Sequence, residues 1–334
     1  RRGFLKLAGT LLFGNLIVGC KDKHHKAFRT EQPNPQPAPG NPQAPQQNTH
    51  DYSGIIKDNE GTPLGATVTL TQIDNFGAPT GTSFSNRADT SGNYFLNDVP
   101  NGDYSMNVST SSGYFNFGKT FRLLSTNGNV TDNLVLIRKE PLDVNSSYKD
   151  VLEMIRDISE SRITDSVQKA RRFMDGKIKV FLDRARGSVG YIVSVEDALA
   201  QLEAQTGLNL FEETTISRDA NIVMSYERNQ GAKGLTQILS LASINGVNVP
   251  EKVQVKLRDD LSSAVARAAA AREIGHSLFG AKGYSKDRTH VTWRDSNFAN
   301  TGDPLGGSFV TADEGRAARL LYKLPIGLDF RFYS

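Results

Sequence analysis

The chain has 334 residues, which is more than one hydrophobic core usually supports, so we expect at least two domains. Its 39 Lys and Arg residues nearly balance its 36 Asp and Glu residues, and no basic block stands out, which argues against a nucleic-acid partner. The only cysteine is Cys20, so disulfides within the chain and thiolate metal clusters are excluded.

Residues 1–20 read RRGFLKLAGTLLFGNLIVGC, the pattern of a targeting segment: paired arginines, a short apolar run and a cysteine. The apolar run is shorter than the roughly 20 residues that a membrane span needs. Its start resembles a twin-arginine export signal, and residues 17–20 resemble the lipobox of a bacterial lipoprotein signal peptide. The resemblance implies that Cys20 is acylated and anchors the protein in the membrane lipid. Because Lys21 follows, we expect the outer membrane or the surface of the cell envelope.

The next segment, residues 21–50, is predicted to be a disordered stalk. Its centre, EQPNPQPAPGNPQAPQQN at residues 31–48, is rich in Pro and Gln and has almost no apolar side chains. Such a composition cannot bury enough surface to fold.

Residues 51–140 change to short β-rich runs separated by Gly, Asn and Asp. Apolar and polar residues alternate in ATVTL at residues 66–70 and in YSMNV at residues 104–108, which is typical of half-buried strands. We expect an all-β sandwich of about seven antiparallel strands.

The turns of this segment carry three phrases in a fixed order: GTPLGA at 61–66, DTSGNYF at 89–95 and VPNGDY at 99–104. Together they resemble the carboxypeptidase regulatory-like domain. The resemblance implies that Tyr94 and Tyr104 pack between the sheets and that glycines occupy turns with positive φ. It implies a spacer or adhesive module and brings no catalytic residue.

Residues 141–175 are predicted to be a helical connector, because apolar residues recur near helical spacing between charges. From residue 176 to 334, the pattern predicts a strand (177–183), a helix (194–207), several strands and an alanine-rich helix (261–280). This order resembles the matrixin branch of the metzincin zinc proteases, as does the final helical stretch VTADEGRAARLLYKLPIG. The resemblance implies an α/β metalloprotease fold.

The metal motif of that family, H-E-x-x-H, places two histidines one helical turn apart so that both bind zinc, while the glutamate activates a metal-bound water. Here the corresponding residues read AREIGH: Glu273 occupies the general-base position and His276 the second-ligand position. Arg272 stands where the first histidine should be. A guanidinium has no lone pair and stays positively charged, so it cannot replace a zinc ligand.

Other departures accompany Arg272. Tyr284 aligns with the third histidine, and a tyrosine with a pKa near 10 is a poor metal ligand. Thr292 stands at the methionine of the family's Met-turn. A rearranged zinc site of His276, Asp287 and His290 is an open alternative, although its spacing matches no recognised motif. We also predict that the cation of Arg272 neutralises Glu273 or a nearby acid.

Three functions follow from these patterns. The first is a non-catalytic pseudoprotease of the cell envelope, without cofactor, that binds an extended peptide or protein along the expected edge strand 220–227, at Val223 and Met224. The second is an active zinc metalloendopeptidase with unusual ligands and Glu273 as general base. The third is a structural or adhesive surface lipoprotein.

Overall fold

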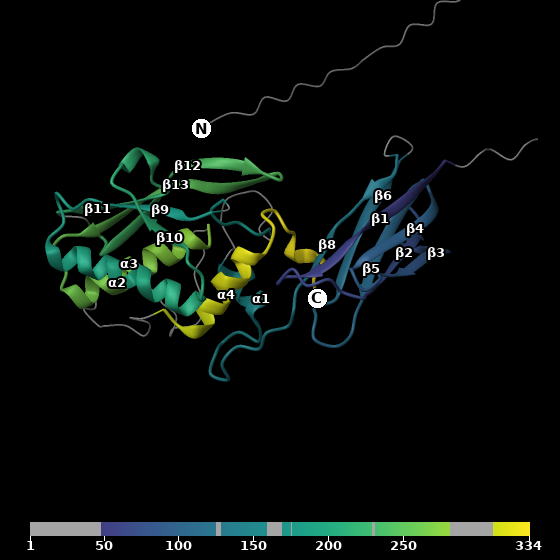
Figure 1. The fold of residues 1–334 in the computed structure, drawn as a ribbon, viewed down its shortest axis with the longest axis horizontal. Coiled ribbons are helices and arrows are strands. Elements are labelled where there is room, and N and C mark those ends of the chain that lie inside the picture. Colours follow the sequence, from purple (N-terminus) through teal and green to yellow (C-terminus); the bar gives the residue numbers. More distant parts are fainter. Residues whose placement is uncertain (1–47, 125–127, 159–168, 175, 229–230, 281–309) are drawn as a thin grey trace, which may run out of the picture. The chain divides into compact units, whose positions relative to one another are not determined.

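The computed structural model describes residues 48–124, 128–158, 169–174, 176–228, 231–280 and 310–334 (Figure 1). By its contacts the chain divides into two units, Arg1–Gln46 and Gln47–Ser334, and all described residues belong to the second. The predicted export signal with Cys20, and all but the end of the predicted stalk, lie outside the described residues. No helix in the described part is long and apolar enough to cross a membrane. The described structure consists mostly of β-sheets with a few helices (Figure 1).

The first part is a β-sandwich, as the alternating pattern predicted. Its eight described strands are β1 (Thr49–Asp58), β2 (Thr67–Ile73), β3 (Pro79–Arg87), β4 (Asn93–Pro100), β5 (Gly102–Ser109), β6 (Phe117–Leu123), β7 (Val130–Thr131) and β8 (Leu134–Leu136). One sheet has the order β4-β1-β7, with β8 also paired to β1, and the other has the order β3-β2-β5-β6. Strands β7 and β8 run parallel to β1, and the remaining pairs are antiparallel.

The core between the sheets is built from the alternating residues. Val68 and Leu70 of β2 are buried, whereas the threonines beside them are partly exposed. Tyr94 and Tyr104 are buried in the same core, as the resemblance implied. Gly92 occupies a turn with φ of 80°, where an added Cβ would lie 2.4 Å from the carbonyl oxygen of Ile56. Only glycine fits this close approach in a left-handed conformation.

The predicted connector contains α1 (Val151–Ile158), whose five apolar residues are all buried. Residues 159–168 of the connector lie outside the described part. The helix is therefore a packed element and shares its core with the sandwich and with the last helix of the chain.

The C-terminal part is an α/β body. Its elements are β9 (Ile178–Leu182), α2 (Val189–Thr206), β10 (Phe211–Glu213), η2 (Ser217–Asp219), β11 (Ile222–Glu227), β12 (Gly234–Ile244), β13 (Val247–Arg258), α3 (Ser263–Leu278), α4 (Ala312–Lys323) and η3 (Phe330–Phe332). The sheet has the order β10-β9-β11-β13-β12. Four strands are parallel, and β12 is antiparallel to β13. Helices α2 and α3 lie against one face of the sheet (Figure 1).

One expectation about this sheet was wrong, and one strand was missed. The strand at Val223 and Met224 is β11, which pairs with β9 on one side and β13 on the other, so it is an interior strand. The described edges are β10 and β12. The sequence analysis did not predict β12 as a separate strand. Asn245 and Gly246, with φ of 50° and 71°, form the tight turn of the β12–β13 hairpin. This hairpin places β13 beside β11 and thereby covers the edge of β11.

The last residues of the chain pack against the sandwich. The Tyr333 ring centroid lies 5.3 Å from that of Phe117, and the Tyr333 hydroxyl donates to the carbonyl oxygen of Val135 at 2.5 Å. Asn116 and Ser334 exchange two backbone hydrogen bonds of 2.9 and 3.0 Å. The chain end is thus part of the sandwich core.

Candidate functional site

The three motif residues lie at the end of α3, the alanine-rich helix. Small side chains let this helix pack closely on the sheet and on α2: Ala266, Ala269 and Ala270 are fully buried. The next turn carries Arg272 and Glu273, both partly exposed, and His276, which is 6% exposed. Three polar side chains therefore replace alanine where the helix passes the edge strand β12.

Strand β12 holds the carboxylate of Glu273 in place. The Thr236 hydroxyl lies 2.7 Å from Oε2 of Glu273 and 3.1 Å from its carbonyl oxygen, so it donates to the glutamate. Gly234 lies two residues earlier, and a Cβ added there would be 2.8 Å from Cγ of Glu273. The absence of a side chain at Gly234 lets the strand approach the helix closely enough for the Thr236 hydrogen bond.

The electrostatics of Glu273 combine opposing effects. Burial raises the pKa of the Glu273 carboxyl, whereas the hydrogen bond from Thr236 and the positive charge of Arg272 oppose that rise. The net result is a pKa above the ordinary value. The neutralisation of Glu273 by Arg272 stays a prediction.

The described residues do not fit a zinc site of the metzincin kind. Of the two helix positions that would supply ligands, only His276 has an imidazole, and Arg272 brings a positive charge without a lone pair. No group of three His, Cys, Asp or Glu side chains suited to a metal is found among the described residues. Tyr284, Asp287, His290 and Thr292 lie outside the described residues, so the predicted third ligand and the rearranged set remain predictions.

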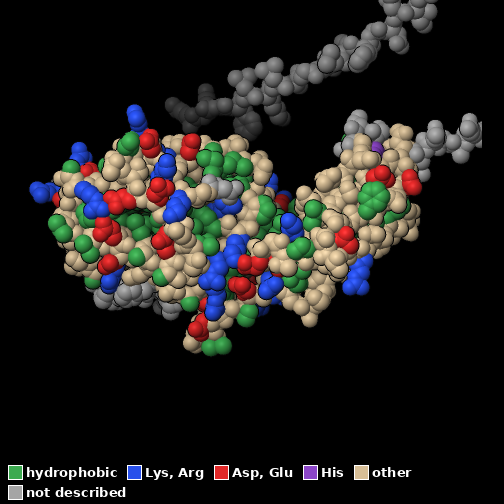
Figure 2. Space-filling model, in the orientation of Figure 1, with side chains coloured by type: hydrophobic (Ala, Val, Ile, Leu, Met, Phe, Trp, Pro, Cys, Tyr) green, Lys and Arg blue, Asp and Glu red, His purple; other side chains and the backbone are tan. Residues whose placement is uncertain are grey.

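On the side that alternates with Thr236, β12 presents a row of exposed apolar side chains. Every second residue of the strand is exposed, and Leu235, Leu239 and Leu241 are 46%, 48% and 47% accessible. Hydrophobic side chains gather over the position of this hairpin in the space-filling view (Figure 2). We call these three leucines the leucine row. Sequence reasoning missed it, although GLTQILSLASI followed by Asn-Gly is a recognisable hairpin signal.

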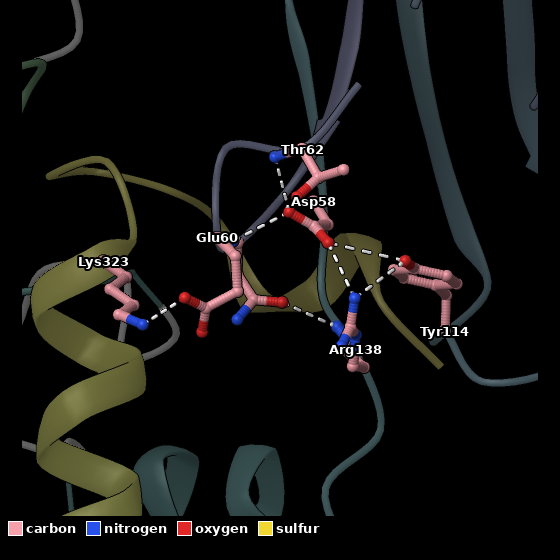
Figure 3. A network of polar contacts seen from close by, with 7 residues as sticks. Asp58, Glu60, Thr62, Tyr114, Arg138 and Lys323 are labelled. Carbon is pink, nitrogen blue, oxygen red and sulfur yellow. Dashed lines mark hydrogen bonds and ion pairs between the residues drawn. The ribbon is translucent and has the colours of Figure 1, made fainter. Parts of the chain in front are cut away.

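A second polar cluster lies where the turn after β1 meets α4 (Figure 3). Oδ1 of Asp58 accepts from the backbone N–H of Glu60 at 2.9 Å and of Thr62 at 2.8 Å, and its Oδ2 accepts from Arg138 at 3.0 Å. Glu60 forms an ion pair with Lys323 of α4. The contacts of Asp58 satisfy a buried carboxylate and close the turn, and the Glu60–Lys323 pair joins this turn to α4, so this network has a structural role.

Comparison with known proteins gives no family. No protein-family model matches the chain, and no curated protein matches it. Among solved structures, the chain is similar to the major pilin SpaD of Corynebacterium diphtheriae, with 15% identity over 28% of this chain and 30% of that protein, and a TM-score of 0.24. It is similar to the minor pilin GBS52 of Streptococcus agalactiae, with 18% identity over 30% of this chain and 49% of that protein, and a TM-score of 0.23.

A third similar structure is the 3-chlorocatechol 1,2-dioxygenase of Rhodococcus opacus 1CP, with 11% identity over 29% of this chain and 63% of that enzyme, and a TM-score of 0.23. The chain spans less than two thirds of each of these three proteins. These likenesses are consistent with the β-sandwich described above. At such low scores they carry no argument about activity, ligand or location.

Proposed function

We propose that the C-terminal body binds an extended protein segment along β12 and does not cleave it. The observation that carries this proposal is the leucine row on the 11-residue edge strand β12, which alternates with the positions that face α3, among them Thr236. An edge strand offers unpaired backbone N–H and C=O groups to an incoming strand, and exposed side chains at alternate positions give specificity. We therefore propose β12 as the binding strand, in place of β11, where the sequence analysis had expected it.

The proposal includes a metzincin-like origin of this body. Its support is the order of elements on which the resemblance was based: a strand followed by a helix, further strands, and a long helix that carries Arg272, Glu273 and His276. The cation of Arg272 beside Glu273 speaks against hydrolysis by a zinc-activated water. We place the protein in the bacterial cell envelope, anchored through Cys20, on the basis of residues 1–20 alone.

A structural or adhesive envelope protein is the second candidate. It is favoured by the packing of Tyr333 and Phe332 against Phe117, which joins the chain end to the sandwich and makes the sandwich part of the same core as α4. In that case the leucine row would have no ligand of its own.

The test uses the immobilised full chain and a display library of random 12-residue peptides. We expect enrichment of peptides with apolar residues at alternate positions, and loss of their binding in the double variant Leu235→Lys, Leu241→Lys. The matched control is Glu212→Lys, which introduces a lysine at an exposed position of the opposite edge strand β10. Control and wild type should bind alike, with or without a chelator.

Hydrogen exchange then locates the bound peptide. Protection of residues 234–244 supports the proposal. Protection elsewhere, or equal binding by the double variant, contradicts the β12 site. A library that yields no binding peptide favours the structural candidate.

A further inference from the structure

A second surface, independent of β12, lies on the sandwich. A cleft with a volume of about 600 Å³ opens on the outer side of the sheet β4-β1-β7, where the end of β3 borders β4. Its lining includes Asn86, Asn93, Asn133, Arg87 and the ring of Phe95. Phe95 is 49% exposed although it lies in the middle of β4.

Three asparagine amides in this cleft are oriented by the backbone or by a neighbouring side chain. Oδ1 of Asn86 accepts from the N–H of Phe95 at 3.3 Å, and Oδ1 of Asn133 accepts from the N–H of Ile55 at 3.1 Å. Neither amide nitrogen donates to another described residue, so both NH2 groups are held ready to donate to a ligand. Asn93 is oriented the other way.

Nδ2 of Asn93 donates to the carboxylate of Asp89 at 3.0 Å, which leaves its Oδ1 as an acceptor. The Asp89 carboxylate also accepts from the backbone N–H groups of Ser91 and Asn93, both at 2.8 Å. The contacts of this carboxylate among the described residues all lie within its own turn. The cleft therefore offers two oriented donors and one oriented acceptor beside an exposed aromatic ring.

We propose that this cleft binds a neutral pyranose saccharide. Sugar hydroxyl groups both donate and accept, which matches amides oriented in both senses. The C–H face of a pyranose fits the electron-rich face of the Phe95 ring. The charge of Arg87 at the cleft is balanced by that of Asp89, so no net charge selects an ionic ligand. Oriented polar groups with an apolar platform are the usual composition of a small-ligand site.

The test is a binding assay of the full chain against immobilised glucan, mannan and xylan oligosaccharides, with uronic-acid oligosaccharides as the charged comparison. Phe95→Ala should weaken binding of the neutral oligosaccharides by about tenfold or more, as expected for a central aromatic anchor. The matched control is Phe76→Ala, because Phe76 is 96% exposed in the turn between β2 and β3, outside the cleft. This control should bind as the wild type does.

Asn86→Asp and Asn133→Asp provide a second readout. Each keeps the oxygen that accepts from the backbone N–H and removes the donor NH2 group, so the strand contacts persist while binding falls. Thermal melts of both variants check that the sandwich remains folded. The proposal is overturned if no neutral oligosaccharide binds, if only the uronic acids bind, or if Phe95→Ala binds like Phe76→Ala.

Discussion

The sandwich and the α/β body both bury polar atoms, but these atoms have different partners. In the sandwich, the hydroxyls of Tyr94 and Tyr104 donate to the carbonyl oxygens of Asp132 at 2.7 Å and Pro100 at 2.8 Å. In the α/β body, α3 places a guanidinium, a carboxylate and an imidazole in neighbouring positions near the end of a helix that packs through small and apolar residues. The two tyrosine hydroxyls are paired with backbone carbonyl oxygens, so they have a structural role. The second set gathers charged and titratable groups where α3 passes β12, which makes it the candidate site.

Tyr104→Ala should show the largest effect and tests the scaffold side of this comparison. The side chain is fully buried, and truncation of a large aromatic side chain in a core costs about 3–5 kcal/mol. Urea unfolding measures the loss. Tyr104→Phe, which removes only the hydroxyl, should cost about 0.5–1.5 kcal/mol. Equal losses for the two variants would contradict a core held mainly by ring packing.

Arg272→Ala should have the next largest effect, about 1–3 kcal/mol of unfolding free energy at pH 7, because the partly buried carboxylate of Glu273 loses a nearby opposite charge. The control is the same change in a Glu273→Gln background, where the loss should shrink since no carboxylate remains. A loss within the ordinary surface range of about 0.5 kcal/mol would remove the role assigned to Arg272.

Glu273→Gln tests the direction in which the fold moves the pKa of this carboxyl. The folded pKa of Glu273 lies above the unfolded value, so its stabilising contribution is complete below the unfolded pKa and is lost as pH rises through the folded pKa. Gln can still accept the hydrogen bond from Thr236 and does not titrate. Relative to wild type, the variant should therefore gain stability between pH 4 and pH 7. Urea midpoints at both pH values decide this, and a relative gain by the wild type would mean the pKa is lowered.

Leu241→Ser should have the smallest effect on folding. The side chain is exposed, so the change in unfolding free energy should stay within about 0.5 kcal/mol. Peptide binding should nevertheless fall if the leucine row is a binding surface. A loss of several kcal/mol would instead identify Leu241 as part of the packed core.

The sandwich was predictable because its signals are local. Alternation at residues 66–70 and 104–108 sets which side chains enter the core, and the intervening glycines and asparagines set the turns. The order of strands in the sheet of the α/β body is not set by local signals. The interior position of β11 depends on the β12–β13 hairpin, which returns to pair beside it after a connection of several residues.

The candidate site was predicted in part for the same reason. Helical spacing places Arg272, Glu273 and His276 on neighbouring turns of one helix, so their proximity follows from the sequence. The contacts of Glu273 with Thr236 and Gly234 join residues 37 or more positions apart and required the sheet. In the sandwich cleft, Asn93 is oriented by Asp89 of its own turn, whereas Asn133 is oriented by the backbone of Ile55, 78 positions away.

The central claim is that the C-terminal body binds its ligand without a metal ion. The most direct test of this claim is to measure the zinc content of the full chain after refolding with excess zinc. The full chain is needed because Tyr333 packs onto the sandwich. We predict that elemental mass spectrometry finds no zinc in the wild type and one equivalent in the double variant Arg272→His, Tyr284→His. One equivalent in the wild type, lost in His276→Ala, would contradict the proposal and point to an active metalloendopeptidase.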